Sequence, residues 1–249
     1  DLRLGPLVLN CHGMFFLFGA LAAYLWTRAR VPREHHEHLD LVASWMTLGG
    51  ILGARLLYVL LNPALLAEPW HILALWEGGL VSYGGLVGAA LAWWLYLRKH
   101  GLPMDLFNHA IGPPALMAWG IGRIGCFLNW WHEYGTVTTV PWAFVVGQDP
   151  PRHPVMLYLA VGHILAALAA ALLARRLRLR ADGLALIGYG LVRGTFDVWR
   201  DYDPEWLRAG SQAVAAVLVL VLRGRYPEST PSPEPQAGGA PEARSAPTP

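Results

Sequence analysis

Long apolar runs constrain the fold of this chain more than any other feature. A transmembrane helix needs about twenty mostly apolar residues. Seven stretches approach or reach that length, at roughly 5–27, 39–62, 79–97, 104–128, 154–174, 183–200 and 207–223. The last is the weakest, because its apolar part, GSQAVAAVLVLVL, has only thirteen residues, so six spans remain an alternative. The sequence predicts an all-α, polytopic membrane bundle of about seven helices.

The composition agrees with a membrane protein and excludes several other classes. Apolar residues make up 55% of the chain and charged residues 14%, well below the quarter or so that is usual in soluble domains. The net charge of +2 gives no reason to expect nucleic-acid binding. Cys11 and Cys126 lie in apolar runs without metal-ligand spacing. The segment REHHEH, 33–38, is expected to be a solvated loop, so no metal and no cofactor are predicted.

The basic residues predict how the spans are oriented. Loops after the first, third, fifth and seventh spans, together with the tail, hold twelve of the nineteen Lys and Arg residues, and the loops on the opposite side hold four. The positive-inside rule therefore places the N-terminus outside and the C-terminus in the cytoplasm. Residues 226–249 contain seven prolines and no aliphatic side chain larger than alanine. We expect a transmembrane catalytic domain, 1–225, and a disordered Pro-rich cytoplasmic tail, 226–249.

Three arginines fall inside the predicted spans: Arg55, Arg123 and Arg193. Counting about 1.5 Å per residue from the outer end of each span places all three roughly 8–10 Å deep. His12 and Tyr83 fall at comparable depths in two further spans. A charged side chain in a bilayer costs at least about 2.5 kcal/mol, so this common polar level predicts a cavity that binds an anionic group near the outer face.

A structural role is the alternative for each arginine. Asp197 follows Arg193 by four residues and precedes Arg200 by three, which is ion-pair spacing on a helix. For Arg55 the structural and functional readings are equally supported, whereas function is favoured for Arg123 and Arg193. Glycines around Tyr83 and Arg123 permit close approach either of a helix or of a ligand.

The ordered motifs of the chain resemble those of the prolipoprotein diacylglyceryl transferase family. They are LGPLVLNCHG, GARLLYV, WEGGLVSYGGLVGA, GRIGCFLN, RHPVMLY, YGLVRGTFDVWR and SQ at 211–212, and together they cover residues 4 to about 222. The resemblance implies seven spans in the bacterial cytoplasmic (inner) membrane. It implies transfer of the diacylglyceryl group of phosphatidylglycerol to the lipobox cysteine of a prolipoprotein, releasing glycerol 1-phosphate in the first step of lipoprotein maturation. A monomer is expected.

The resemblance also implies roles for particular residues. Arg123, Arg193 and Arg200 would bind the lipid phosphate. From their own chemistry, Asn129, Gly84 and Gly85 are further candidate substrate contacts. Asn129 capping its helix is the alternative. The substrate's thiol is mostly protonated near neutral pH and is helped by a base. The candidate catalytic groups beside the arginines are His12, Tyr83 and Glu133, with His132 as another possible base.

This chain departs from the usual family pattern at several of these positions. His12 stands where a tyrosine is usual, and Tyr83 where many members have a histidine, which suggests that the two residues have exchanged roles. Cys126 replaces an asparagine, Asp197 a glutamate and Leu159 another glutamate. One extra residue lies between Gly125 and Gly135, and an exposed loop pair is an equally good reading of His132 and Glu133. These departures leave the arginines in place and alter the acid–base groups.

Two other functions remain open from the sequence. The first is a transporter or phospholipid-binding membrane protein whose arginines bind an anion, although the two halves show no convincing repeat. The second is a family relative that has kept the fold and lost or altered the reaction, which the changes at His12, Tyr83 and Asp197 motivate.

Overall fold

The structure is a computed structural model that describes residues 2–4, 7–9, 11–67, 70, 79–129, 135–145 and 147–200. Within these residues the secondary structure is helical apart from a short antiparallel hairpin and three isolated bridges, and loops such as 135–145 and 147–154 connect the helices. The bounds are β1 Leu2–Leu4, β2 Leu7–Leu9, α1 Cys11–Arg28, η1 Arg33–His35, α2 His36–Leu61, η2 Pro63–Ala67, α4 Ser82–Lys99, α5 Met104–Asn129, α6 Val155–Leu177, α7 Ala181–Phe196 and η4 Asp197–Trp199. The helices coincide closely with six of the seven predicted spans. The seventh predicted span and the tail lie outside the described residues.

Two details of the prediction were wrong. The first helix begins at Cys11 rather than near residue 5, because the backbone of Leu7–Leu9 pairs with that of Leu2–Leu4. The segment 33–38 is helical rather than a loop, formed by η1 and the start of α2. His36 fixes this turn through a hydrogen bond between its Nε2 and the carbonyl of Val31, and His38 Nδ1 bonds the hydroxyl of Tyr96.

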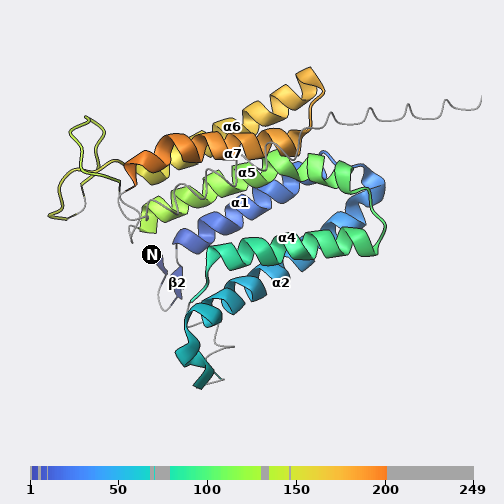
Figure 1. Cartoon of the computed structure of the whole chain (residues 1–249), viewed down its shortest axis with the longest axis horizontal. Coiled ribbons are helices and arrows are strands. Elements are labelled where there is room, and N and C mark those ends of the chain that lie inside the picture. The colour runs from blue at the N-terminus through green and yellow to red at the C-terminus, as the bar shows by residue number, and fades with distance from the viewer. Residues whose placement is uncertain are drawn as a thin grey trace, which may run out of the picture.

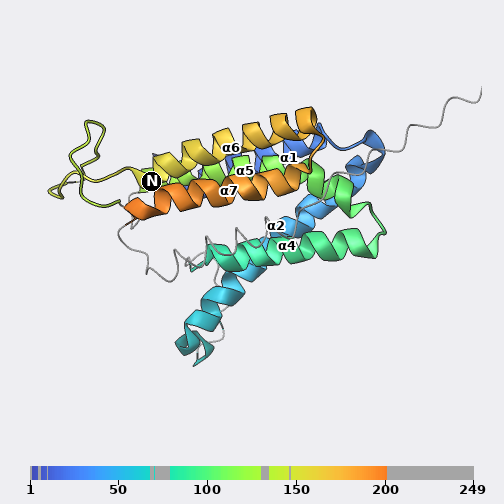
Figure 2. The same ribbon diagram turned by 45° about the horizontal axis from the view of Figure 1, so that its top comes forward.

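The helices form a four-helix group and a two-helix pair. Helices α1, α5, α6 and α7 pack side by side, and α2 and α4 form an antiparallel pair beside them (Figures 1 and 2). We call the end where α1 and α6 begin and α5 and α7 end the site end. The opposite end, where α4 and α6 finish in Arg98, Lys99, Arg175 and Arg176, is the basic end.

The pair joins the group mainly near the basic end. There α2, α4 and α5 share an apolar cluster built around Val42, Leu97 and Phe107, all fully buried. Trp93 Nε1 of α4 donates a hydrogen bond of 2.8 Å to Asn108 Oδ1 of α5. A second cluster around Ala167 and Ala170 joins α5, α6 and α7 in the middle of the group.

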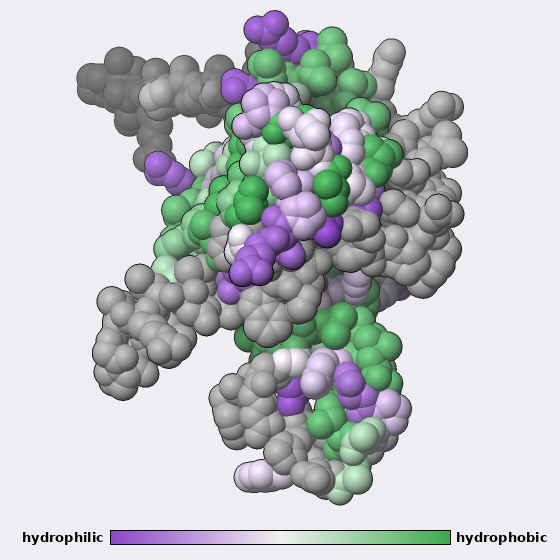
Figure 3. All heavy atoms as spheres, turned by 90° about the vertical axis from the view of Figure 1, so that its left-hand side faces the viewer, coloured by the Kyte–Doolittle hydropathy of each residue, from purple (hydrophilic) through white to green (hydrophobic). Residues whose placement is uncertain are grey.

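The outer surfaces of the helices are those of a membrane protein. Among the described residues, three helical stretches are long and apolar enough to cross a bilayer: Arg33–Leu61, Met104–Asn129 and Val155–Leu177. Large apolar side chains such as Leu60, Leu165 and Leu191 are 60–67% exposed along their flanks. In the end-on view from the site end, polar residues gather on that face while apolar residues cover the sides (Figure 3).

Candidate functional site

A buried charge cluster occupies the site end of α7. Arg193, Asp197 and Arg200 are only 3%, 0% and 6% exposed. Arg193 Nε lies 3.0 Å from Asp197 Oδ2, and Arg200 Nη1 lies 3.4 Å from Asp197 Oδ1. The helix creates this arrangement, because residues four apart share a face and η4 turns Arg200 back toward Asp197. One carboxylate thus faces two guanidinium groups, so these three side chains together carry one positive charge.

Arg123 enters the same region from α5. Its guanidinium carbon lies 5.0 Å from the ring centre of Trp119, one turn earlier. Its Nη1 lies 3.8 Å from Cys126 Sγ and 3.7 Å from Met156 Sδ on α6. Sulfur atoms and an aromatic face are weak partners for a guanidinium compared with a carboxylate or phosphate. These contacts help to hold Arg123 in place between α5 and α6.

Two glycines place Arg123 at a close helix crossing. A Cβ atom at Gly125 would lie 3.1 Å from the Cα of His12, and one at Gly122 would lie 3.1 Å from the ring of Phe16. Helix α1 therefore approaches α5 at the turns that flank Arg123. The GRIG motif thus serves helix packing, and that packing brings His12 beside the helix that carries Arg123.

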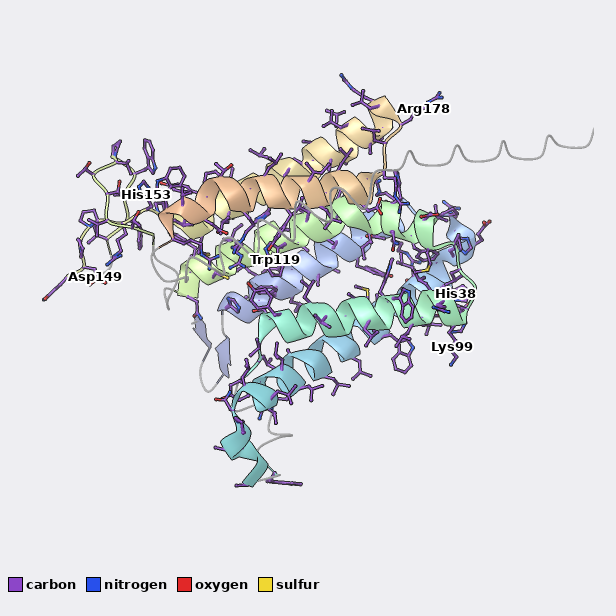
Figure 4. All side chains as sticks on the ribbon, viewed as in Figure 1. His38, Lys99, Trp119, Asp149, His153 and Arg178 are labelled. Atoms are coloured by element: carbon purple, nitrogen blue, oxygen red, sulfur yellow. The ribbon has the colours of Figure 1, made fainter. Side chains whose placement is uncertain are left out.

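Tyr189 is the common neighbour of the polar groups. This α7 residue lies within electrostatic range of Arg123, Arg193 and Asp197, and also of Tyr83 from α4. Its ring meets Trp119 edge-on at 6.4 Å. Polar side chains from α4, α5 and the end of α7 therefore lie within electrostatic range of one phenol. Arg123, Arg193 and Tyr83 belong to the set predicted to share one depth, and that common depth stays a prediction. Trp119 lies inside the bundle, nearer the site end than Lys99 (Figure 4).

Sequence reasoning missed His163, which completes this region from α6. Its ring stacks on Tyr189 at 5.4 Å and is fully buried. The charges of Arg123 and Arg193 both reach it. Neither ring nitrogen makes a hydrogen bond, although the carbonyl of Leu159, one turn earlier, is near. An unpaired buried imidazole is rare, and the only available signal was a histidine in an otherwise apolar span.

The other predicted residues lie around this centre at different levels of exposure. His12 is half-buried, with its ring 4.8 Å from that of Phe16. Tyr83 is 57% exposed on α4. Asn129 is the half-buried last residue of α5. Their predicted roles in catalysis and substrate binding stay predictions. His132 and Glu133 lie outside the described residues.

Arg55 and the glycines of α4 have clear structural contacts. Arg55 is 6% exposed, and its Nη1 donates a hydrogen bond of 3.1 Å to the carbonyl of Gly79. Its guanidinium also lies over the ring of Tyr58 at 5.3 Å. Gly84 packs against the backbone of Gly53 on α2, and Gly85 faces Gly50. These contacts give Arg55 and both glycines a role in fixing α4 on α2, and substrate contact at Gly84 and Gly85 stays a prediction.

A loop covers the site end beside Arg200. Thr136 N donates to the carbonyl of Trp199, and Gly135 pairs with Arg200 in an antiparallel bridge. His153, from the motif RHPVMLY, stacks on Trp199 at 5.3 Å, and its Nδ1 lies 3.2 Å from the hydroxyl of Tyr158. The motif therefore ties the loop to the end of α7, which holds Arg200 at the site end.

The donor set of the site suits an anion rather than a metal. Within the described ranges, no three His, Cys, Asp or Glu side chains gather as metal ligands. Two arginines, Arg193 and Arg200, face one described carboxylate, Asp197, and a third, Arg123, lies within electrostatic range of the nearby Tyr189. Guanidinium groups bind phosphate through paired N–H donors, and a low-dielectric setting strengthens such bonds. The arrangement fits a phosphate or another oxyanion at the level of Tyr189.

Comparison with known proteins gives one consistent result. Residues 2–224 match the family model described as prolipoprotein diacylglyceryl transferase. Three similar proteins are each named phosphatidylglycerol–prolipoprotein diacylglyceryl transferase. The one from Azotobacter vinelandii is 38% identical over 167 residues, 63% of this chain and 62% of that protein. Those from Pseudomonas paraeruginosa and Nitratidesulfovibrio vulgaris are 33% and 34% identical over 237 residues, covering 88% and 89% of each chain.

Proposed function

Because the chain belongs to the prolipoprotein diacylglyceryl transferase family, we propose that it transfers the diacylglyceryl group of phosphatidylglycerol to the lipobox cysteine of prolipoproteins. The observation that supports this proposal is that Arg123 and Arg193, from different helices, both lie within electrostatic range of Tyr189. A phospholipid phosphate is the anion that a membrane protein meets at this depth. The products are a thioether-linked lipoprotein precursor and glycerol 1-phosphate.

The arginines would act on the leaving group. The thiol sulfur attacks the glyceryl carbon that bears the phosphate, so a C–S bond forms and a C–O bond breaks. The electron pair of the C–O bond leaves with the phosphate, and the thiol proton passes to a base. Arg123 and Arg193 hold the phosphate before the reaction and offset its growing charge, which lowers the barrier only to the extent that binding tightens in the transition state.

Other residues would position the arginines and the thiol. Asp197 lies 3.0 Å from Arg193 Nε and would orient that guanidinium toward the phosphate. Arg200, held beside the loop, would bind the same head group. His12, Glu133 and His132 are the proposed bases, with Tyr83 as a hydrogen-bonding partner. Asn129, Gly84 and Gly85 are the proposed substrate contacts.

We further propose a monomer with seven spans in the bacterial inner membrane, with the N-terminus outside and the tail, 226–249, in the cytoplasm. The support is the distribution of basic residues over the helix ends. Arg28, Arg98, Lys99, Arg175 and Arg176 all end their helices at the basic end, and Lys99 and Arg178 lie at that same end (Figure 4). The domain of 1–225 would then hold the whole active site.

Transfer of lipid to a lipobox peptide in phosphatidylglycerol vesicles tests the function. The purified protein should form the lipidated peptide. Arg123→Ala and Arg193→Ala should each lower kcat/KM by about 100-fold or more, as loss of a charge-stabilising donor does. Arg176→Ala, an exposed arginine at the basic end, is the matched control and should keep full activity. Full activity in both site variants, with correct insertion, would refute the phosphate-binding role.

Complementation separates this function from a relative with a changed reaction. A bacterium depleted of its own transferase should grow when it expresses this protein. It should not grow with Arg193→Ala at equal membrane abundance. Binding of phosphatidylglycerol without rescue or peptide lipidation would instead identify a phospholipid-binding relative.

A further inference from the structure

A long apolar groove runs along the outside of the α2–α4 pair. Its volume is about 680 Å³, within the range typical of ligand pockets. Glycines of both helices, where the two backbones touch, lie along its length. Its walls are apolar side chains at helical spacing: Leu52, Leu56, Leu60, Val87, Leu91 and Leu95. The groove is separate from the arginine site, since none of the three site arginines lines it.

The groove faces away from the rest of the bundle. On α4, Trp93 and Leu97 are buried against α5. Leu91 lies two residues before Trp93, and Leu95 lies two residues before Leu97. Each leucine is therefore about 200° around the helix from that buried residue, on the opposite side of α4. Leu91 is 51% exposed and Leu56 on α2 is 61% exposed. The walls therefore open to the surroundings of the protein, which for apolar spans is the bilayer.

The two ends of the groove differ in charge. Lys99 and His100, both exposed, line it at the basic end together with Tyr96. Arg98 lies next to them with its guanidinium over the ring of Trp94 at 5.2 Å. Glu37 is the acidic residue whose charge reaches Tyr96. At the other end the lining is Leu57, Leu60 and Gly84. A ligand in the groove therefore meets positive charge at the basic end and apolar side chains everywhere else.

We propose that this groove binds an anionic phospholipid from the leaflet at the basic end, with an acyl chain along α2 and α4 and the phosphate at Lys99. Gly84 and Lys99 are fifteen residues apart, so the groove is about 22 Å long. One leaflet has a hydrocarbon depth of about 15 Å, so the groove accommodates one acyl chain from the head-group level. Basic residues at a bilayer surface attract anionic head groups.

The charge favours a lipid over a peptide. A signal peptide carries its positive segment before its apolar helix, and in the proposed topology that segment would lie at the basic end. Lys99 and Arg98 repel such a segment and attract a phosphate. The lipid would support the α2–α4 pair, which is joined to the bundle near the basic end and leaves its leucines exposed along the groove.

Native mass spectrometry of the full chain in nanodiscs of mixed phosphatidylglycerol and phosphatidylcholine tests the groove. The groove variants are made in the double variant Arg123→Ala/Arg193→Ala, which should no longer bind lipid at the proposed transferase site. This background should retain one phosphatidylglycerol. Leu91→Trp, which fills the groove, should lose it. Leu172→Trp, at a leucine of α6 that is also 51% exposed but outside the groove, should retain it.

Lys99→Gln tests the head group without changing the shape of the groove. It should lower the preference for phosphatidylglycerol over phosphatidylcholine by about fivefold, the effect of one basic residue near a bilayer surface. Retention of lipid in Leu91→Trp, or an unchanged preference in Lys99→Gln, would overturn the proposal. So would displacement of the lipid by a lipobox signal peptide that cross-links to position 91. Activity is measured separately, so failure of the transferase function leaves these results interpretable.

Discussion

Asp197 determines how two buried arginines are held, Arg193 of α7 and Arg200 just after η4. It is fully buried and is the one buried carboxylate in the described ranges. A buried arginine without a partner is far more costly than a paired one, so Asp197 makes Arg193 and Arg200 tolerable inside the bundle. One carboxylate cannot neutralise two guanidinium groups. The residual positive charge is what an incoming phosphate would neutralise, which links the stability of the site to its ligand.

Two substitutions of Asp197 should distinguish the effect of removing its charge from the effect of lengthening its side chain. Asp197→Ala leaves two buried arginines without their carboxylate and should cost about 3–5 kcal/mol of stability, together with most of the transfer activity. Asp197→Glu keeps the charge and should retain activity within about tenfold, since an extra methylene usually costs only about 1–3 kcal/mol. Thermal unfolding in detergent measures the stability of each variant, and the vesicle assay measures its transfer activity. Equal stability of Asp197→Ala and the parent protein would contradict the ion-pair argument.

The position of His163 in the site could not be predicted from the sequence. The Arg193–Asp197 pair was readable, because both residues lie on one helix at a fixed spacing. His163 contacts Tyr189 of another helix, and no spacing within α6 indicates that contact. Arg55 lies between these cases: its position inside an apolar helix could be predicted, whereas its hydrogen bond to the carbonyl of Gly79 depends on how the chain leads into α4.

Replacing His163 with leucine should leave the protein as stable or make it more stable. The imidazole is fully buried with both nitrogens unpaired, and an unpaired buried polar group costs about 1–3 kcal/mol. Leucine removes that cost and loses only the stacking on Tyr189. The melting temperature of His163→Leu should equal or exceed that of the parent. His163→Ala, which leaves a cavity, should melt lower, and a large loss in both variants would mean that the ring is hydrogen-bonded after all.

At the scale of elements, glycines decide how closely α2 and α4 pack. Gly49, Gly53, Gly84 and Gly88 bring the two backbones into contact along the crossing. The sequence indicated close approach at GGLVG and could not decide between a helix and a ligand as the neighbour, because small residues suit both. To predict which residue each glycine contacts, one must know the register between the two helices. The sequences of apolar helices do not determine that register.

Gly84 and Gly85 form a matched pair that distinguishes packing from substrate contact. A Cβ at Gly84 would overlap the carbonyl oxygen of Gly53, whereas one at Gly85 would lie 3.3 Å from that of Gly50. Gly84→Ala should therefore force the helices apart and cost about 1–3 kcal/mol. Gly85→Ala should be nearly neutral in thermal unfolding. If Gly85→Ala instead abolishes transfer at unchanged stability, Gly85 contacts the substrate.

For the whole molecule, the sequence predicted the apolar helices well and their termini less well. Hydropathy sums over many residues, so errors at single positions cancel and the spans emerge within a few residues. The hairpin of β1 and β2 was missed because its leucines are as apolar as those of a helix. The loop at the site end was also missed, since its bonds to Trp199 and Arg200 join segments far apart in the chain.

The proposed orientation of the bundle rests on the positions of its basic residues and can be tested directly. Cys11 and Cys126 are first replaced with serine, and single cysteines are introduced at Asp149 and at Arg176, two exposed positions at opposite ends. A membrane-impermeant thiol reagent added to intact spheroplasts should label the cysteine at 149 and spare that at 176 until the membrane is opened. Twelve basic residues on one side against four on the other require this outcome under the positive-inside rule. The reverse pattern would place Arg123 and Arg193 on the cytoplasmic side, where a transferase acting on exported prolipoproteins cannot meet their lipobox cysteine, and both the topology and the function would then have to be abandoned.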